Sequence, residues 1–248
     1  MSRPGASLRN RLRELLNWTA RTPLHPQWLV TLLHRGRAEW IATRARGDTL
    51  DVGCADASIR AACRLVTRYV GLDYPATATD YYRTKPCIYG DARRLPIADE
   101  RFDTMMLLDV AEHVDGITSA LLEAGRILRR GGVLLITIPF AYPLHDQPHD
   151  YQRMTEYGLR SNLASTGFDD VQITEVGDAI SAGASTLAMA MAQGMIGTIE
   201  RRSPAMVLAP LVIAAITIVN LVGWLGYRIM PATGFMPAAY YVQARRSG

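Results

Sequence analysis

The chain has 248 residues and a formal net charge of +4, so it exceeds a minimal domain and can bury one sizeable core. Its three cysteines have neither the spacing of a metal centre nor that of a disulfide framework, and they are typical of reduced thiols in a cytosolic compartment. The sequence contains no internal repeat and no low-complexity tract. Its start is rich in arginine and lacks a long apolar core, so we expect no secretory signal.

The first 47 residues form a basic segment. They contain nine arginines against two glutamates, a net charge of +7, whereas the remainder of the chain carries −3. Four leucines share one helical face: Leu8, Leu12, Leu15 and Leu16. Residues 28–40 suggest a second helix with two tryptophans. We predict a basic amphipathic helical segment over residues 1–47, which either lies in an anionic membrane surface or caps a ligand cleft.

The first strong motif is a turn after a predicted buried strand. Residues 49–58 read Thr-Leu-Asp-Val-Gly-Cys-Ala-Asp-Ala-Ser, and a second apolar run ends in Asp73. A strand that breaks into small residues, followed by a strand ending in an acid, is typical of a Rossmann-type nucleoside site. Dinucleotide sites need G-x-G-x-x-G, but this turn has only Gly53, with alanines and Asp56 where a pyrophosphate would lie. The turn therefore favours a nucleoside without phosphate, such as S-adenosylmethionine.

Strands and helices alternate after this turn. Residues 102–108 form a continuous apolar run, as expected of a strand covered on both faces. Residues 117–128 have helical spacing, and residues 129–132 should end that helix with cations and glycines. A second helix is predicted over residues 155–165. The other strands are predicted over residues 68–73, 88–92, 133–138, 171–176 and 239–244. This alternation indicates an α/β sheet.

A series of motifs occurs in a characteristic order. They are Leu50-Asp51-Val52-Gly53-Cys54, Gly71-Leu72-Asp73, Gly90-Asp91-Ala92, Leu95-Pro96-Ile97 with Phe102-Asp103, Glu112-His113-Val114, and Leu128 to Gly132. Together they resemble the class I S-adenosylmethionine-dependent methyltransferases, in the subgroup that includes quinone-ring and sugar-methylating enzymes. The resemblance covers roughly residues 48–176 and returns at 240–245. It implies a Rossmann-like, seven-stranded, mostly parallel sheet with helices on both faces.

The resemblance also implies which residues hold the cofactor. In that family the first turn and the acid at Asp73 hold the methionine tail and the ribose. Asp91 and Ala92 correspond to the adenine contact, and the residues that end with Asp109 line the floor beside the methyl group. The predicted cofactor-binding residues are Asp51, Gly53, Cys54, Ala55, Asp73, Tyr74, Asp91, Ala92, Leu107, Leu108 and Asp109. The family usually has glycine where Ala55 and Ala57 stand, which leaves open a non-catalytic protein that binds the cofactor.

The segment after the fifth predicted strand, residues 142–155, contains two His-Asp pairs. They are His145-Asp146 and His149-Asp150. In this fold the loop follows the strand edge where ligands bind, and a histidine oriented by a carboxylate can deprotonate a hydroxyl. We predict that His145, His149 and His113 are catalytic and that no metal is bound. A metal-binding role and a purely structural role of the loop are the alternatives.

Two uncharged stretches follow, over residues 179–199 and 203–227, separated by Glu200-Arg201-Arg202. About 20 apolar residues span a bilayer, and both stretches reach that length. Alanines recur at every fourth position of the first stretch, which permits close helix packing. The second stretch contains Pro210, which should bend it, and Asn220, which should need a polar partner.

The predicted topology limits how this apolar insertion meets a membrane. Because the last strand must rejoin the same sheet, the insertion has to leave and return on one side. Two full crossings would place Arg201 and Arg202 outside, against the positive-inside tendency, whereas a shallow hairpin lets them snorkel back. We predict a helical hairpin over residues 179–235, and a methyltransferase domain over 48–178 with 236–248. Two true spans and a soluble cap or dimer interface are the alternatives.

A membrane insertion implies a lipid-borne acceptor. We predict a methyltransferase at the cytoplasmic face of a membrane, peripheral or monotopic, acting on a polyprenyl-linked saccharide, a phospholipid headgroup or a quinone precursor. O-methylation with histidine-assisted deprotonation is expected. The alternatives are an RNA or small-molecule methyltransferase with a soluble cap, and a non-catalytic membrane scaffold that binds the cofactor. We expect no nucleic-acid partner, because the N-terminal arginines accompany an apolar stripe rather than stacking platforms.

Overall fold

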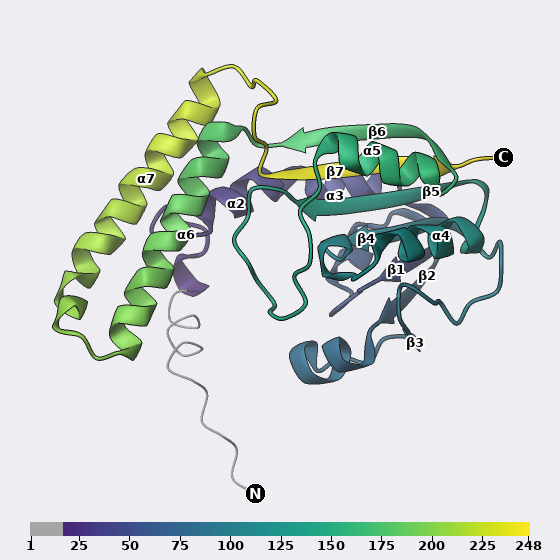
Figure 1. The fold of residues 1–248 in the computed structure, drawn as a ribbon, viewed down its shortest axis with the longest axis horizontal. Helices are drawn as coiled ribbons and strands as arrows, with labels where there is room; N and C mark the ends of the chain where they lie inside the picture. Colours follow the sequence, from purple (N-terminus) through teal and green to yellow (C-terminus); the bar gives the residue numbers. More distant parts are fainter. Residues whose placement is uncertain (1–16) are drawn as a thin grey trace, which may run out of the picture. The chain divides into compact units, whose positions relative to one another are not determined.

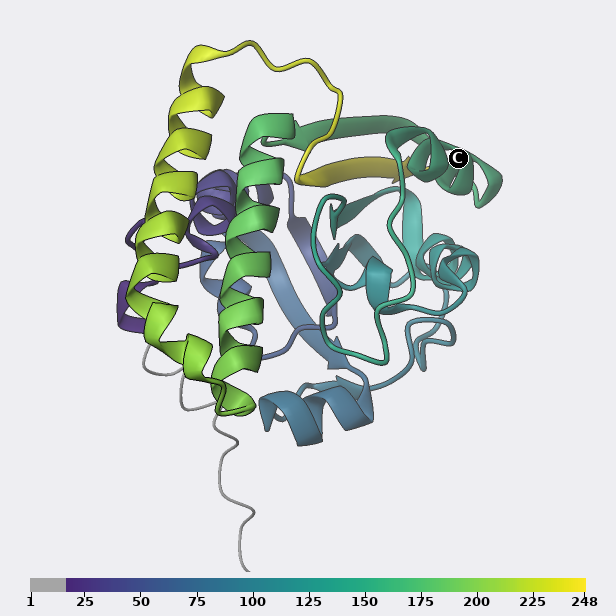
Figure 2. The same cartoon turned by 60° about the vertical axis from the view of Figure 1, so that its left-hand side comes forward.

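The computed structural model describes residues 17–248, which separate into two units (Figures 1 and 2). The sheet unit comprises Gly36–Phe140, Leu144–Glu175 and Ala239–Gly248. The hairpin unit comprises, within the described residues, the chain up to Arg35, Ala141–Pro143 and Val176–Ala238. The predicted N-terminal segment is thus divided between the two units. Its four leucines from Leu8 to Leu16 lie outside the described residues.

The sheet has seven strands in the order β3-β2-β1-β4-β5-β7-β6. Their bounds are β1 Arg46–Val52, β2 Leu65–Asp73, β3 Ile88–Tyr89, β4 Phe102–Leu108, β5 Leu128–Pro139, β6 Phe168–Val176 and β7 Ala239–Arg246. Strands β1 to β5 pair in parallel, and β7 runs antiparallel to β5. The predicted fold class, a mostly parallel Rossmann-like sheet with an apolar hairpin before the last strand, is confirmed.

Apolar residues cover both faces of the central strands. On one face, Met105 and Leu107 of β4 pack in a core with α4 (Ile117–Ile127) and α5 (Glu156–Ser165). On the other face, Met106 packs in a second core with Ile41 of α3 (Arg37–Ala42). Because successive side chains of a strand point to opposite faces, a strand between two cores needs a continuous apolar run. Figure 1 shows these helices around the sheet.

Three predicted elements differ from the structure. The third strand is only Ile88–Tyr89, because Asp91 forms an isolated bridge with Arg94 instead of continuing the strand. Residues 129–132 end α4 as predicted, but they run extended as the start of β5. The predicted second N-terminal helix is two short helices, α2 (Trp28–Leu33) and α3, interrupted by a 3-10 turn at His34–Gly36.

The hairpin unit is built on two long helices, α6 (Ala179–Glu200) and α7 (Ala209–Ile229), which pack side by side. Asp178 and Ser181 form a capping box at the start of α6. Small residues bring the two helices close: a Cβ on Gly223 would lie 2.4 Å from the Cβ of Ala184, and one on Gly226 would lie 2.7 Å from Ile180.

Asn220 and Pro210 of α7 are accommodated in different ways. Asn220 is buried, and its amide nitrogen donates to the carbonyl oxygens of Pro23 at 2.7 Å and His25 at 3.0 Å. The predicted need for a partner is thus met by the chain that precedes α2. Pro210 lies in the first turn of α7, directly after a 3-10 turn at Pro204–Leu208, and its missing N–H is not needed there.

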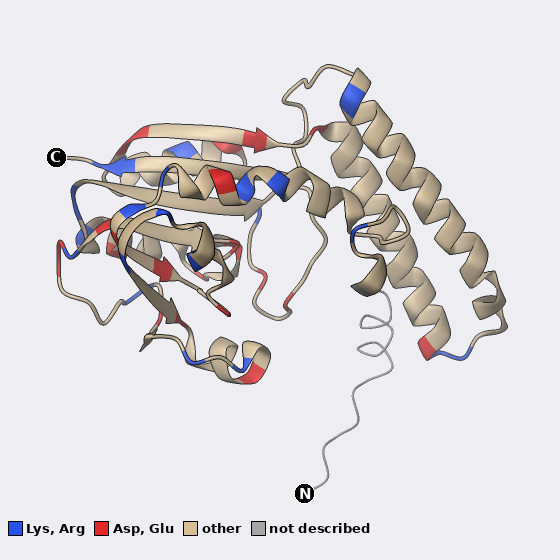
Figure 3. Ribbon diagram, turned by 180° about the vertical axis from the view of Figure 1, so that it is seen from behind, with Lys and Arg blue, Asp and Glu red and all other residues tan. Residues whose placement is uncertain are grey.

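The outward side of α7 is apolar rather than polar. Ile216, Asn220 and Gly223 are the buried residues of the helix. The large exposed residues at helical spacing are Leu211, Ile218, Val222, Leu225 and Ile229. We call these five residues the apolar stripe. Figure 3 shows that charged residues mark the ends of the two long helices and not their middle. By length and composition both α6 and the segment Pro204–Ile229 could cross a membrane, and only 22% and 11% of their apolar windows are buried.

Candidate active site

The carboxyl ends of the parallel strands meet at one edge of the sheet, where ligands bind in this class of fold. The turn after β1 is held against the end of β2. The backbone nitrogens of Gly53 and Cys54 donate to the carbonyl oxygen of Leu72 at 2.8 and 3.2 Å. The nitrogen of Ala55 donates to Oδ2 of Asp73 at 2.9 Å. The predicted nucleoside turn and the predicted ribose acid are therefore in direct contact.

Asp73 is 2% exposed and ends β2. Its second oxygen, Oδ1, accepts from the backbone nitrogen of Tyr74 at 2.7 Å. Burial raises the pKa of Asp73, and the two backbone hydrogen bonds oppose that rise. An ionised carboxylate offers about four lone-pair sites, so two backbone donors leave capacity for the hydroxyls of a ribose. The side chain of Tyr74 is half exposed beside this acid in the chain.

The backbone of the turn follows a path that normally requires glycine. Gly53, Ala55 and Ala57 have φ values of 75°, 46° and 55°. Each alanine costs about 1–2 kcal/mol in this left-handed region. The two alanines that depart from the family pattern thus keep a glycine-type backbone. At Gly53 the requirement is also steric, because a Cβ would lie 2.3 Å from Cγ2 of Val110.

Asp51 lies beneath the turn on β1. It is 2% exposed, and its carboxylate accepts a short hydrogen bond from the hydroxyl of Tyr69. Burial raises the pKa of Asp51 to about 7, while Tyr69 and the guanidinium of Arg37 lower it. Burial also raises the pKa of the Cys54 thiol to about 12, with Asp51 and Asp73 adding to the rise, which disfavours the reactive thiolate.

The raised pKa of Asp51 predicts a pH effect on stability. The folded protein holds the proton up to about pH 7, whereas the unfolded chain releases it near its ordinary value of 3.8. The unfolding free energy contributed by this residue is thus greatest below pH 3.8 and is lost as the pH rises through 7. Asp51→Asn cannot ionise and can still accept from Tyr69. We expect the variant to gain stability relative to wild type between pH 4 and pH 8, by about 4 kcal/mol at most.

Urea unfolding of both proteins in the same detergent, at pH 4 and pH 8, measures this difference. Because only the difference between the two proteins is used, other titrating groups cancel. A stability difference that stays constant with pH would contradict the assignment of a raised pKa to Asp51.

The other predicted cofactor residues lie along the same edge. The nitrogen of Gly90 donates to the carbonyl oxygen of Asp73 at 3.0 Å, which joins the ends of β2 and β3. Asp91 pairs with Arg93 at 2.7 Å, and this guanidinium holds the pKa of Asp91 below its ordinary value. Ala92 and Leu107 are buried, and Leu108 is partly buried at the end of β4.

Asp109 is fixed by two groups that its position in the sequence does not reveal. Its Oδ2 pairs with Nη1 of Arg37 at 2.5 Å, and its Oδ1 accepts from the hydroxyl of Thr137 at 2.8 Å. Arg37 was counted only as part of a basic segment, and it lies on α3 in the sheet unit. The sequence carried no signal for this pair, since 72 positions separate its members.

The structure brings two of the three predicted catalytic histidines together. His113 follows β4 in a 3-10 turn, η5 (Ala111–His113), and His145 lies in the loop between β5 and α5. Their ring centroids are 4.8 Å apart in an edge-to-face arrangement. Nε2 of each histidine lies 3.8 Å from Oε1 of Glu112. Glu112 was not among the predicted site residues, although the Glu112-His113 motif was a signal for it.

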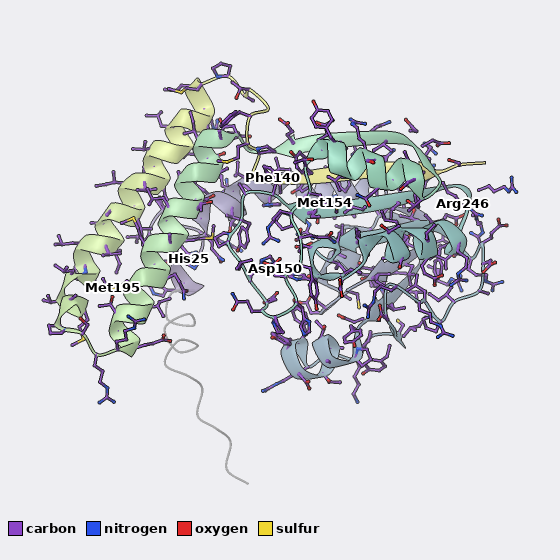
Figure 4. All side chains as sticks on the ribbon, viewed as in Figure 1. His25, Phe140, Asp150, Met154, Met195 and Arg246 are labelled. Carbon is purple, nitrogen blue, oxygen red and sulfur yellow. The ribbon has the colours of Figure 1, made fainter. Side chains whose placement is uncertain are left out.

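Asp150 and Arg153 hold this loop in place. Oδ1 and Oδ2 of Asp150 accept from Arg153 at 2.5 and 2.8 Å, and Oδ2 also accepts from the backbone nitrogen of His145 at 3.0 Å. The Arg153 guanidinium lowers the pKa of Asp150 to about 2. Figure 4 labels Asp150 on this loop. His149 is exposed, and its ring contacts the Tyr151 hydroxyl at 3.1 Å, so its side chain is not part of the histidine pair.

Comparison with known proteins assigns the central part of the chain. Residues 50–136 match the family model Methyltransf_11, described as a methyltransferase domain. A probable S-adenosylmethionine-dependent methyltransferase of Mycolicibacterium smegmatis is 30% identical over 105 residues, which cover 40% of this chain and 41% of the relative. The chain thus spans about two fifths of the length of that curated relative.

Solved structures share the fold at low identity. A SAM-dependent methyltransferase from Archaeoglobus fulgidus has a TM-score of 0.52 at 17% identity, covering 88% of this chain and 94% of its own. Phosphoethanolamine N-methyltransferase 2 of Haemonchus contortus, solved with S-adenosyl-L-methionine, has a TM-score of 0.52 at 12% identity. The match covers 95% of this chain and 60% of that protein's chain. The [4+2]-cyclase SpnF has a TM-score of 0.54 at 19% identity, and the match covers 85% of this chain and 80% of the cyclase chain. This last case shows that the fold does not fix the reaction.

The matched segment, from β1 to β5, is similar to a methyltransferase domain, and this similarity supports the predicted enzyme class and its cofactor, S-adenosylmethionine. The turn suits that cofactor. It lacks the glycines that cradle a pyrophosphate, and Asp56 is an exposed carboxylate within it. Such a turn, together with Asp73, fits a ligand whose sulfonium and ammonium groups are positively charged.

Proposed function

We propose that this protein is an S-adenosylmethionine-dependent methyltransferase that works on a lipid-linked or lipid-like acceptor at a membrane surface. The observation that carries the proposal is the apolar stripe of α7. A helix of a soluble protein turns its apolar side toward a core, whereas α7 buries only Ile216, Asn220 and Gly223 and turns most of its large apolar side chains outward. A contiguous apolar surface of this kind marks a membrane or protein contact.

The attachment of the hairpin unit supports this reading. The chain enters α6 directly after β6 and returns to the sheet at Ala239, which pairs in register with Pro139 at the carboxyl end of β5. The insertion is therefore tethered to the edge of the sheet that carries the cofactor turn. Both ends of the hairpin join the same edge of the sheet. This arrangement fits a hairpin that dips into the bilayer and returns, with the sheet unit in the cytoplasm. Polyprenyl-linked saccharides, phospholipid headgroups and quinone precursors are acceptors of the required kind.

For methyl transfer, the protein has to position the acceptor more than it has to activate it chemically. The cofactor supplies a methyl group already activated on a sulfonium. Asp73 would accept from the ribose hydroxyls, and the left-handed turn from Gly53 to Ala57 would leave room for the methionine tail. For a hydroxyl acceptor, His145 is the candidate base, because Asp150 lies 3.3 Å from its Nδ1 and orients the ring.

The test compares lipids from cells that carry the wild-type gene, no gene, or the Asp73→Ala variant. Losing the ribose hydrogen bonds should weaken cofactor binding by about 1–3 kcal/mol, measured by calorimetry with S-adenosylhomocysteine. We expect mass spectrometry to find a lipid that is one methylene heavier only in wild-type cells. A heavier species found in the RNA or the soluble metabolites, with unchanged lipids, would overturn the proposed acceptor.

A further inference from the structure

We propose that Glu112, His113 and His145 form a binding site for one divalent first-row transition metal ion. One ligand atom from each residue lies within 4.8 Å of the other two. The proposal goes beyond the proposed function, because binding of an ion can be measured without any acceptor, membrane or methyl donor. From the sequence we expect no metal, because no fixed helical spacing supports the His and Asp residues of the loop over residues 142–155 as ligands.

The carboxylate of Glu112 is the strongest argument for a cation. The residue is 0% exposed, and neither carboxylate oxygen has a hydrogen-bond partner among the described residues 17–248. An ionised carboxylate buried without a partner is costly, so such groups in proteins are paired or coordinate a metal. The polar atoms that face it are Nε2 of His113 and Nε2 of His145, each 3.8 Å from Oε1. A cation between these three atoms would satisfy the carboxylate.

His113 is already in the form that binds a metal. Its Nδ1 lies 2.7 Å from the carbonyl oxygen of His149. A carbonyl can only accept, so Nδ1 carries a proton, and in the neutral imidazole the lone pair is then on Nε2. Metal-bound histidines usually donate the other ring N–H to a carbonyl or carboxylate in this way.

Nδ1 of His145 lies between a carboxylate and a guanidinium. It is 3.3 Å from Oδ2 of Asp150 and 3.4 Å from Nη2 of Arg153. Nη2 has two N–H groups and can donate to Asp150 and to Nδ1 together, but with an ion on Nε2 the proton would be on Nδ1, where Oδ2 of Asp150 is the acceptor within reach. A proton on Nδ1 leaves the lone pair on Nε2, facing Glu112. The chain therefore supplies the outer hydrogen bonds as well as the three ligand atoms.

The ligand set selects the class of ion. Two imidazoles and one carboxylate suit zinc, iron(II), cobalt or manganese rather than calcium or magnesium. Binding at about 2.0–2.2 Å from each ligand needs side-chain shifts of about an ångström from the present spacing. Oδ2 of Asp146, 3.9 Å from Nε2 of His113, is a further oxygen within reach. Water or an acceptor oxygen can occupy the remaining positions.

An ion here would change the role of His145. A histidine that ligates a metal cannot accept a proton at the same nitrogen. The ion would instead lower the pKa of a hydroxyl bound to it. Failure of the metal proposal would return His145 to the role of base and leave the proposed function intact.

The test uses full-length protein in detergent, stripped with a chelator and dialysed. Titration with Co²⁺ alone should give visible d–d absorption that saturates at one ion per chain, and Zn²⁺ should displace it. Glu112→Gln and His145→Ala should each weaken Co²⁺ binding by about 100-fold or more, since even outer-shell changes cost 10–100-fold. His149→Ala is the matched control, because it removes a histidine of the same loop whose ring lies outside the cluster while keeping the carbonyl that holds His113.

Two further measurements distinguish loss of the metal site from loss of folding. Thermal unfolding and S-adenosylhomocysteine binding show whether each variant is folded. X-ray absorption of zinc-loaded wild type should show two imidazoles and an oxygen ligand, and it needs no variant. Absence of stoichiometric Co²⁺ binding, or equal loss of binding in His149→Ala, would overturn the proposal.

Discussion

Replacing Ile218 and Val222 of α7 with aspartate should release the protein from vesicles that contain anionic lipid. These side chains are 62% and 61% exposed and lie four positions apart on the apolar stripe. A charged residue at the centre of a membrane helix costs about 2.5–3.5 kcal/mol, so two of them should lower partitioning by about 10⁴- to 10⁵-fold. The cost falls toward the interface, so a smaller loss would place the hairpin at a shallower depth. Flotation with vesicles measures the bound fraction.

Leu122→Asp is the matched control for this experiment. Leu122 is 54% exposed and lies on α4 of the sheet unit, so the variant adds one such charge at an exposed apolar position outside the hairpin. We expect the control to float like wild type, and the double variant to need less detergent in purification. Wild-type protein that stays monodisperse without detergent and does not float would contradict the membrane proposal and favour a soluble cap or a dimer interface.

Substitution of the histidine cluster should lower turnover while cofactor binding holds. We expect His145→Ala to lower methyl transfer by about 10²- to 10⁴-fold, whether His145 acts as a base or as a metal ligand, and Glu112→Gln to do the same if the cluster holds an ion. His149→Ala should stay near wild type, because its ring contacts Tyr151 rather than Glu112. Transfer of a labelled methyl group into extracted lipid measures turnover, and calorimetry with S-adenosylhomocysteine measures cofactor affinity.

The turnover of these variants distinguishes a role of the cluster in methyl transfer from a role of His149 and from a purely structural role of the loop. Near-native turnover in His145→Ala and Glu112→Gln would mean that the reaction needs neither a base nor an ion at this position. A loss confined to His149→Ala would instead restore the histidine that the sequence alone suggested. Parallel loss of cofactor affinity in every variant would indicate a structural role of the loop.

The sequence determined the elements whose signal is local. The continuous apolar run at residues 102–108 predicted β4 because a strand between two cores must be apolar on both faces. The turn at Gly53 and the acid at Asp73 were predictable because a nucleoside turn needs small residues and an acid at fixed spacing. The two apolar stretches predicted α6 and α7, since length and hydropathy are properties of the chain itself.

Only the tertiary structure decided which distant residues meet. Arg37 reaches Asp109, and His145 reaches Glu112, across gaps in the sequence that carry no periodic pattern. It also showed that Ala55 adopts a backbone conformation usually reserved for glycine, which composition would not predict. Hydropathy identified α7 as an apolar helix, but which side is buried depends on its packing with α6. The physical reason is the same in each case: local propensity fixes an element, whereas contacts and burial arise from how separate elements pack.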